Sequence, residues 1–478
     1  METDILVRQN QWWKNTDSIE EDYHLGLYKE SKIKWQPKLQ YEFVLDKDLI
    51  YVLRGPRQVG KTTLLKLIIK DLLLKDKVDP RTVFYFACDQ GGIQNDRSLK
   101  DLLETYIDWT RETVKKQRLY IFLDEVTYTK KWSTGVKVVA DTGRLKNAVV
   151  IATGSHAIDL KHGAERMPGR RGVGIGLDKI MLPMNFREFL FTVLSDLSKK
   201  IPFVDCLEPQ KVYKQCRELT LHQEEINNMF MKYLVSGGFP KPVSKLFSEN
   251  RISKDIYELY RHAIVGDLVR MGKREDYFRQ ISSAILNKMT NPFDWRDIVN
   301  ETEVGSHNTV SDYIFDIEQL FIWNVFYHIK SIGGKKIAFK KRKKIYFKDP
   351  FIFHNIRAWC ERMPDEWSAS KEYVENKEKL GHLVESIVAT HLKSHFEDVF
   401  YWRKDSEDEI DFAVLGPENR WTYIEAKYQT NIVASEAKRL RKVGGGIILS
   451  KNTLDISPDK KIVIVPVHLF RDCSKLVG

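Results

Sequence analysis

The chain has 478 residues, with 77 Lys and Arg against 66 Asp and Glu, which gives a formal net charge of +11 at pH 7. A hydrophobic fraction of 42% is sufficient for ordinary buried cores. No apolar run approaches the roughly 18 residues of a membrane-spanning helix, and the acidic N-terminus is unlike a signal peptide. We therefore expect about three domains, a cytoplasmic location and no membrane partner.

The charge balance and the cysteines set further limits. A basic excess permits a nucleic acid or another polyanion as partner, although a solvated cationic surface would give the same total. The 5 cysteines are scattered and lack metal-binding spacing, so we expect free thiols in a reducing compartment.

The first segment with a chemical signature follows the apolar run at residues 49–53, an expected strand. The candidate phosphate-binding residues come next: Gly55, Pro56, Arg57, Gln58, Val59, Gly60, Lys61, Thr62 and Thr63. Strand, glycine loop, Lys-Thr and helix is the order of a P-loop, whose backbone N–H groups and helix N-terminus bind phosphate. We expect Lys61 to reach the β- and γ-phosphates of ATP and Thr62 to ligate Mg²⁺.

Buried strands then alternate with helical patterns. Apolar runs at residues 82–86, 119–123 and 148–152 are strand candidates, and residues 99–114 have helical spacing. Continuous apolar strands separated by helices predict an α/β fold with a parallel sheet covered on both faces.

Acidic and polar residues end two of these strands. Asp124 and Glu125 follow the run at 119–123, at the edge of a parallel sheet where ligands collect. This pair resembles a Walker B motif, so we expect Asp124 to hold the Mg²⁺ shell and Glu125 to orient or deprotonate the attacking water. The alternative is a pair of surface acids that cap a turn. Ser155 or Thr153 either contacts the γ-phosphate or the water, or only forms the strand-end turn.

A basic loop with several glycines spans residues 167–174. Within it, Arg170 is a candidate arginine finger, which would stabilise transition-state charge in the same chain or in a neighbouring copy. A plain turn is the alternative. A finger supplied by a neighbour would imply a homo-oligomer.

These segments together resemble a large prokaryotic (archaeal and bacterial) family: AAA-type P-loop ATP-binding proteins with a C-terminal PD-(D/E)XK nuclease-like domain of unknown function. The matching segments are residues 54–63, 122–125, 153–155, 169–170, 186–189 and 233–240. The similarity covers nearly the whole chain. It implies an additional-strand, AAA-like ATPase core, and the helical patterns at 191–275 fit its helical lid. His156 stands where the family more usually has a small residue.

Residues 278–330 show a different order of elements. The expected elements are helices at 281–286, 294–299 and 309–318 and a strand at 321–325, which suggests a winged helix-turn-helix. Its polar face at 307–311 either reads DNA or packs against another domain, because nearby acidic residues oppose phosphate contact. The basic run at 335–344 is either a wing that grips phosphate or a solvated turn.

A second chemical pattern lies in the last third of the chain. Glu385 is in a helical stretch, Asp411 is on one expected strand, and Glu425 and Lys427 share one face of the next strand. This D…ExK pattern resembles the PD-(D/E)XK nuclease fold. We expect Asp411 and Glu425 to bind Mg²⁺, Glu385 to complete the shell and Lys427 to position a water or stabilise an anion. The alternatives are a β-hairpin with exposed charges, or a degenerate domain that keeps the fold and has lost the chemistry.

The sequence thus predicts three parts: a P-loop ATPase with its helical lid (1–275), a winged helix-turn-helix (276–350) and a nuclease-like α/β domain (351–478). The expected function is Mg²⁺-dependent ATP hydrolysis coupled to DNA binding or processing. The alternative is a nucleotide-dependent switch that binds protein partners and uses an inactive nuclease-like scaffold.

Overall fold

The computed structural model describes residues 3–470, except residues 91, 115, 175, 195–206, 406–407, 417–418 and 433. The chain divides into two compact units, residues 1–182 (unit 1) and 183–478 (unit 2). The helices at 209–270, which were expected to form a lid on the ATPase core, are grouped with unit 2. The predicted three-part division therefore stays a prediction.

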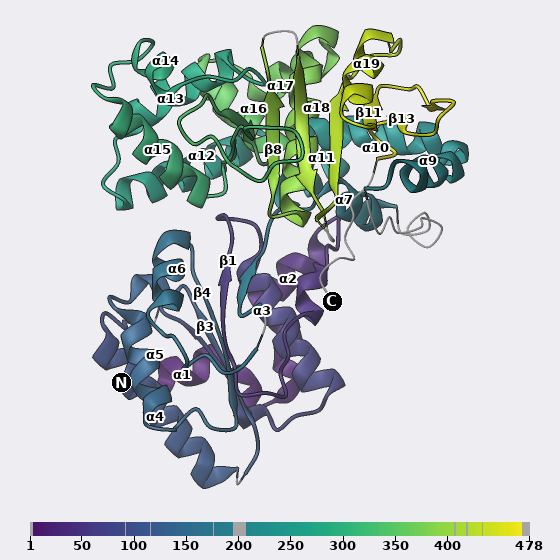
Figure 1. The fold of residues 1–478 in the computed structure, drawn as a ribbon. Coiled ribbons are helices and arrows are strands. Elements are labelled where there is room, and N and C mark those ends of the chain that lie inside the picture. Colours follow the sequence, from purple (N-terminus) through teal and green to yellow (C-terminus); the bar gives the residue numbers. More distant parts are fainter. Residues whose placement is uncertain are drawn as a thin grey trace. The chain divides into compact units, whose positions relative to one another are not determined.

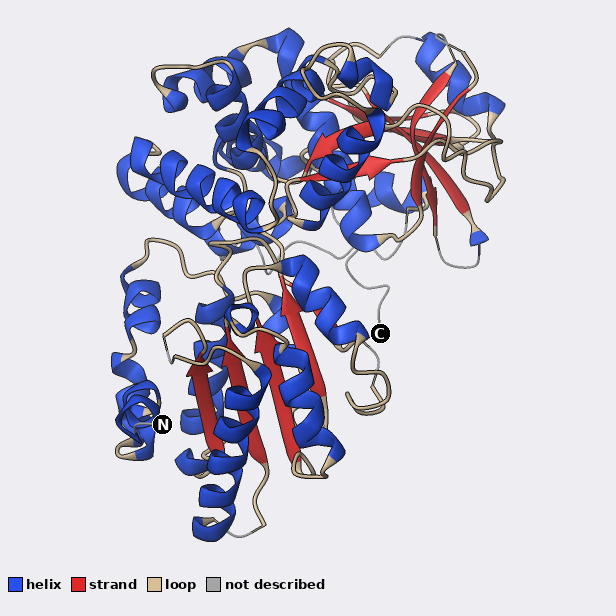
Figure 2. Ribbon diagram, turned by 90° about the vertical axis from the view of Figure 1, so that its left-hand side faces the viewer, coloured by secondary structure: helices blue, strands red, loops and turns tan. Residues whose placement is uncertain are grey.

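Unit 1 is built on a five-stranded parallel sheet in the order β2-β3-β4-β1-β5 (Figure 1). Its strands are β1 (Ile50–Arg54), β2 (Val83–Ala87), β3 (Leu119–Asp124), β4 (Ala148–Thr153) and β5 (Asp178–Ile180). The strands alternate with helices α3 (Lys61–Lys70), α4 (Asp96–Thr113), α5 (Trp132–Asp141) and α6 (Ala157–Glu165). Helices flank the sheet in Figure 2, which is why strands β1 to β4 are mostly apolar.

The lead-in segment packs against this sheet. It contains α1 (Thr3–Gln9) and α2 (Tyr23–Glu30). The indole N–H groups of Trp12 and Trp13 both donate to the Val83 carbonyl oxygen, at 3.0 and 2.9 Å. These tryptophans therefore anchor the lead-in to the edge strand β2.

Unit 2 combines many helices with a six-stranded mixed sheet in the order β12-β13-β11-β10-β9-β8. The strands of this sheet are β8 (Val399–Arg403), β9 (Glu409–Leu415), β10 (Trp421–Ala426), β11 (Gly446–Ser450), β12 (Asp455–Ile456) and β13 (Ile462–Pro466). The neighbours β8, β9 and β10 are antiparallel, whereas β10, β11 and β13 are parallel. Helices α18 (Lys377–His395) and α19 (Ala434–Lys442) complete the order α–β–β–β–α–β.

The remaining elements of unit 2 precede this sheet in the chain. The early helices are α7 (Phe186–Val193), α9 (Pro209–Glu218), α10 (Gln223–Ser236), α11 (Pro240–Glu249) and α12 (Lys254–Arg270). Then come α13 (Glu275–Asn287), α14 (Trp295–Val299), α15 (His307–Gln319), the antiparallel pair β6 (Trp323–Phe326) and β7 (Lys344–Phe347), and helices α16 (Pro350–Cys360) and α17 (Glu366–Glu375). Three helices followed by a strand pair is the order expected for a winged helix.

Two general expectations can be compared with the structure. Within the described residues no helix is long and apolar enough to cross a membrane. Cys88, Cys216 and Cys360 are free thiols, and the other two cysteines lie outside the described residues.

The turn between α10 and α11 requires glycine because the backbone approaches other groups closely. A Cβ atom on Gly238 would lie 1.9 Å from the Met184 carbonyl oxygen. The Gly238 N–H also donates to Asp349 Oδ2 at 2.7 Å. The buried Asp349 carboxylate, whose pKa burial raises to about 7, thereby ties this turn to the N-terminus of α16.

Replacing Gly238 by Ala should destabilise the protein by about 2 kcal/mol, because the added methyl group meets a backbone oxygen. The matched control is Gly266→Ala in α12, where a Cβ has nothing within 4 Å. It should stabilise by about 0.5–1 kcal/mol, since Ala is the better helix former. Scanning calorimetry should show a lower Tm for G238A and an unchanged or higher Tm for G266A. Equal shifts in the two variants would contradict the packing argument.

Candidate functional site

The P-loop sits between β1 and α3 in a tightly turned backbone. Gln58 and Gly60 have positive φ angles of 62° and 106°. A Cβ on Gly55 would lie 2.2 Å from the Met181 carbonyl oxygen, so only glycine fits there. Lys61 is the first residue of α3, and its ammonium donates to the carbonyl oxygens of Gly55 and Pro56, both at 3.0 Å. The lysine predicted to bind phosphate thus lies against the loop that would surround the phosphates.

Asp124 lies at the end of β3, directly beside the P-loop helix. The Thr62 hydroxyl donates to Asp124 Oδ2 at 2.7 Å. Burial, with Glu125 adding to it, raises the pKa of Asp124 to about 6, while the hydrogen bonds from Thr62 and Tyr85 act in the opposite direction. A hydroxyl and a carboxylate oxygen in contact are ligands of the kind that Mg²⁺ prefers, so these residues fit the ion. When bound, Mg²⁺ would neutralise charge on the β- and γ-phosphates.

Glu125 is held by its own backbone and by the neighbouring strand end. Its φ angle is 51°, an uncommon value for a residue other than glycine, and its N–H donates to Asp124 Oδ1 at 3.0 Å. Its Oε2 accepts from the Ser155 N–H at 2.9 Å. The hydroxyls of Ser155 and Thr153 are buried, and the described part of the chain offers them no hydrogen-bond partner. Two buried hydroxyl donors are therefore available at and just after the end of β4.

The sequence reasoning missed Tyr85, which also supports Asp124. The Tyr85 hydroxyl donates to Asp124 Oδ2 at 3.0 Å. Behind it, the buried Lys66 ammonium lies 3.4 Å from the centre of the Tyr85 ring and 3.0 Å from Asp22 Oδ2. The sequence does contain a signal for this role. Tyr85 has a polar hydroxyl within the otherwise apolar strand at 82–86, and it faces the opposite side of the strand from Phe84.

Arg170 lies away from the phosphate loop of its own chain. Its Nε donates to Asp141 Oδ1 at 2.7 Å, at the C-terminal end of α5. The carbonyl oxygen of Arg171, which follows Arg170 in the chain, accepts from the N–H of Ile50, the first residue of β1. The P-loop follows the last residue of β1. Arg170 therefore lies near the end of the sheet at which β1 begins, opposite to the end that carries the P-loop. The structure does not bring it to this site, and a role towards a neighbouring copy stays a prediction.

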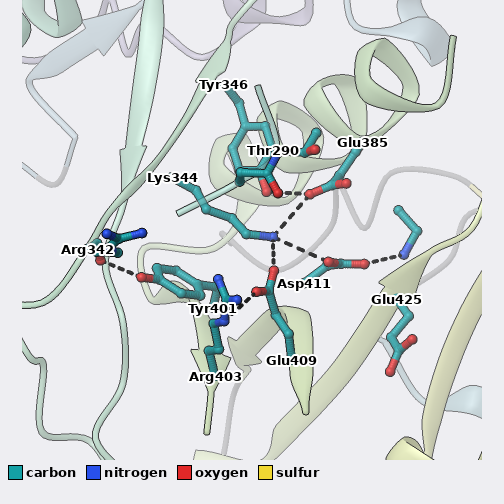
Figure 3. A network of polar contacts seen from close by, with 12 residues as sticks. Thr290, Arg342, Lys344, Tyr346, Glu385, Tyr401, Arg403, Glu409, Asp411 and Glu425 are labelled. Atoms are coloured by element: carbon teal, nitrogen blue, oxygen red, sulfur yellow. Dashed lines mark hydrogen bonds and ion pairs between the residues drawn. The ribbon is translucent and has the colours of Figure 1, made fainter. Parts of the chain in front are cut away.

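A second polar cluster is buried in unit 2 (Figure 3). Lys344 of β7 directs its ammonium towards three carboxylates: Glu385 Oε1 at 3.3 Å, Glu409 Oε1 at 2.5 Å and Asp411 Oδ1 at 3.3 Å. Tyr346, two residues further along β7, donates its hydroxyl to Glu385 Oε1 at 2.6 Å. Lys344 was predicted to belong to a solvated or phosphate-gripping basic run, but its side chain is 1% exposed.

The predicted D…ExK residues are only partly brought together. The Lys427 ammonium lies 3.8 Å from Asp411 Oδ2, which also accepts from the Ala426 N–H at 3.0 Å. Glu425 is fully buried and pairs with Arg439, whose Nη1 lies 3.7 Å from Glu425 Oε2. The structure thus assembles Glu385, Asp411 and Lys427, with Glu425 paired elsewhere.

Burial and the neighbouring charges shift the pKa values of the acidic groups in this cluster in different directions. Burial raises the pKa of Glu385 to about 7, against the opposing effect of Lys344. Burial would also raise the pKa of Asp411, but Lys344 and Lys427 outweigh it and lower the value. The described residues contain no group of three or more His, Cys, Asp or Glu side chains arranged to hold a metal ion. The ammonium of Lys344 lies between Asp411 and Glu385, and Glu425 is paired with Arg439, so a Mg²⁺ ion held by Asp411 and Glu425 with Glu385 completing the shell does not fit this arrangement.

Comparison with known proteins supports the assignment of unit 1. Residues 47–190 match the model of the AAA domain. Residues 227–362 and 380–470 match two domains of unknown function, DUF8612 and DUF4143. An uncharacterized protein of Methanocaldococcus jannaschii is 26% identical over 313 residues, which span 63% of this chain but only 61% of that relative.

Several solved structures also align with this chain. The Walker-type ATPase of Pyrococcus abyssi aligns with a TM-score of 0.38 and 15% identity, over 64% of this chain and 91% of that one. The ORC2 protein of Aeropyrum pernix, in its ADPNP–ADP complexes, aligns with a TM-score of 0.36 and 10% identity, over 73% and 93%. The match to the AAA domain and the parallel sheet with its P-loop together support an AAA-type P-loop ATPase domain at residues 47–190. The winged helix and the nuclease-like domain stay predictions.

Replacing Tyr85 by Phe should weaken binding of Mg²⁺·ATP by about three- to tenfold, because Asp124 loses one of its hydrogen bonds. Binding of ATP in the presence of EDTA should not change. Tyr106→Phe is the matched control, since that hydroxyl donates to the Arg81 carbonyl oxygen. Calorimetric titration with a slowly hydrolysed ATP analogue makes the comparison. An equal loss with and without Mg²⁺ would contradict the role given to Tyr85.

Proposed function

We propose that unit 1 hydrolyses ATP with Mg²⁺. The observation that carries the proposal is one continuous set of hydrogen bonds: Thr62 to Asp124, the Glu125 N–H to Asp124, and the Ser155 N–H to Glu125. It joins the P-loop helix to the ends of two adjacent strands. The expected metal ligand pair, carboxylate base and polar strand end would therefore surround one position.

The roles follow from the chemistry of each group. Lys61 and the backbone N–H groups of the P-loop would bind the phosphates, and Thr62 and Asp124 would hold the metal. Glu125 would orient or deprotonate the attacking water, because its carboxylate is fixed by the Ser155 N–H. The buried hydroxyl of Ser155 or Thr153 would donate to the γ-phosphate or to the water. Tyr85 would act as a positioning residue through Asp124.

We further propose that the nucleotide state of unit 1 is coupled to DNA binding by unit 2. The order α13, α14, α15, β6, β7 supports a winged helix-turn-helix. His307 and Asn308 are exposed at the start of α15, and the chain between β6 and β7 exposes several basic side chains: Lys335, Lys336, Lys340, Lys341 and Arg342. Exposed lysines and an accessible helix N-terminus suit contact with a phosphate backbone.

A second candidate is a nucleotide-dependent switch that binds a protein partner and uses a catalytically inactive nuclease-like scaffold. The α–β–β–β–α–β order of unit 2 supports a nuclease-like fold. The ammonium of Lys344 among the carboxylates favours the inactive form. The two candidates share the ATPase and differ in whether unit 2 binds DNA or a protein partner.

Replacing Glu125 by Gln should lower the rate of ATP hydrolysis by about 100-fold or more while ATP binding is kept, because the amide cannot accept the proton from the water. Glu112→Gln, on an exposed position of α4, is the control. Steady-state assays with and without duplex and branched DNA complete the test. Stimulation of the Glu125-dependent rate by DNA would support the coupling, whereas a rate indifferent to DNA would favour the protein-partner switch. A variant as active as the wild type would refute the proposed mechanism.

A further inference from the structure

The position of Lys344 determines what the second cluster can bind. Its ammonium is the point on which carboxylates from two elements converge, Glu385 from α18 and both Glu409 and Asp411 from β9 (Figure 3). The oxygen atoms lie 2.5–3.3 Å from the nitrogen. Without that ammonium, the three carboxylates would offer oxygen ligands of the kind that a divalent metal prefers.

The cluster already balances its own charge. Its formally charged members are three acids and three bases: Glu385, Glu409, Asp411, Lys344, Lys427 and Arg403. The Lys344 ammonium lies within 3.3 Å of an oxygen of each of the three carboxylates, which offset its charge. A divalent ion would therefore enter a site without surplus negative charge, and no buried charge is left uncompensated without it.

The carboxylates are also held in place around the ammonium. The Tyr346 hydroxyl fixes Glu385, and the Ala426 N–H fixes Asp411. Arg403 lies with its Nε 3.4 Å from Glu409 Oε2. Lys344 and Tyr346 both come from β7, which pairs with β6 and not with the six-stranded sheet that carries Asp411. The cation is thus supplied by a different part of the chain from the acidic residues that it neutralises.

We propose that Lys344 is a built-in counter-ion that fills the cation position between Glu385, Glu409 and Asp411, so that this site takes no divalent metal. Asp411 is also a member of the predicted D…ExK site, whose Glu425 is paired with Arg439, so unit 2 lacks metal-dependent nuclease activity and serves as a binding scaffold. This inference goes beyond the proposed ATPase and does not depend on it, because its test measures metal binding by unit 2 without nucleotide.

The test compares Mn²⁺ binding by the full-length wild type, Lys344→Met and the double variant K344M/D411N, each without nucleotide. Methionine keeps the length of the lysine stem and removes its charge. Free Mn²⁺ measured by electron paramagnetic resonance gives the number of bound ions. K344M should gain one site that binds at least tenfold tighter than any in the wild type, and adding D411N should abolish it. Lys341→Met, at an exposed position, should gain no site.

Two outcomes would overturn the proposal. The first is a folded K344M that gains no Asp411-dependent site. The second outcome comes from a direct comparison of Mn²⁺ binding by the wild type and by Asp411→Asn, so it does not require a Lys344 variant to fold. If the wild type binds one Mn²⁺ more than D411N, the position is already a metal site and Lys344 does not fill it. Circular dichroism of each variant establishes that it is folded. Loss of ATP hydrolysis in any of them would leave this result unaffected.

Discussion

The hydrogen bond from Thr62 to Asp124 is the contact on which the organisation of unit 1 depends. It joins the first turn of the P-loop helix to the end of β3, across residues that are 62 positions apart in the chain. Asp124 is 2% exposed, and a carboxylate so deeply buried needs partners. Thr62, Tyr85 and the Glu125 N–H supply them. The same contacts that satisfy the buried acid also fix the geometry of the expected metal position.

Unit 2 also contains buried carboxylates that need partners, but their partner is a charged side chain. Its buried carboxylates surround a lysine, where a hydrolytic site of the expected kind would hold a metal. The difference between the two units is therefore chemical. Asp124 is met by neutral donors and keeps its charge available for an added cation, whereas Glu385 and Asp411 are already met by the ammonium of Lys344. This contrast supports ATP chemistry in unit 1 and a binding role for unit 2.

The sequence predicted the parts of the molecule that are local in the chain. The P-loop and the acidic pair after β3 are short contiguous motifs, and the alternation of continuous apolar runs with helical patterns was enough to predict the parallel sheet. Tyr85 and Lys344 were missed because their partners are distant, 39 residues away for Asp124 and 41 for Glu385. Lys344 was also hidden in a basic run. Because side chains alternate along a strand, Lys344 and Tyr346 lie on the same face of β7. Only the pairing of β7 with β6 shows that this face points into the protein. Arg170 was predicted to be an arginine finger because it lies in a basic loop with several glycines. Its position at the end of the sheet opposite to the P-loop depends on the turn after α6.

The most direct test of the central claim is the Mg²⁺ dependence of ATP hydrolysis in Thr62→Ser and Thr62→Val. Serine keeps the hydroxyl that contacts Asp124, whereas valine keeps the shape and removes it. The account predicts that T62S hydrolyses ATP at a rate near that of the wild type. It predicts that T62V is at least about tenfold slower and needs more Mg²⁺, as expected for loss of a metal-supporting group. Wild-type rates and Mg²⁺ dependence in T62V would contradict the assignment of this contact as the metal position.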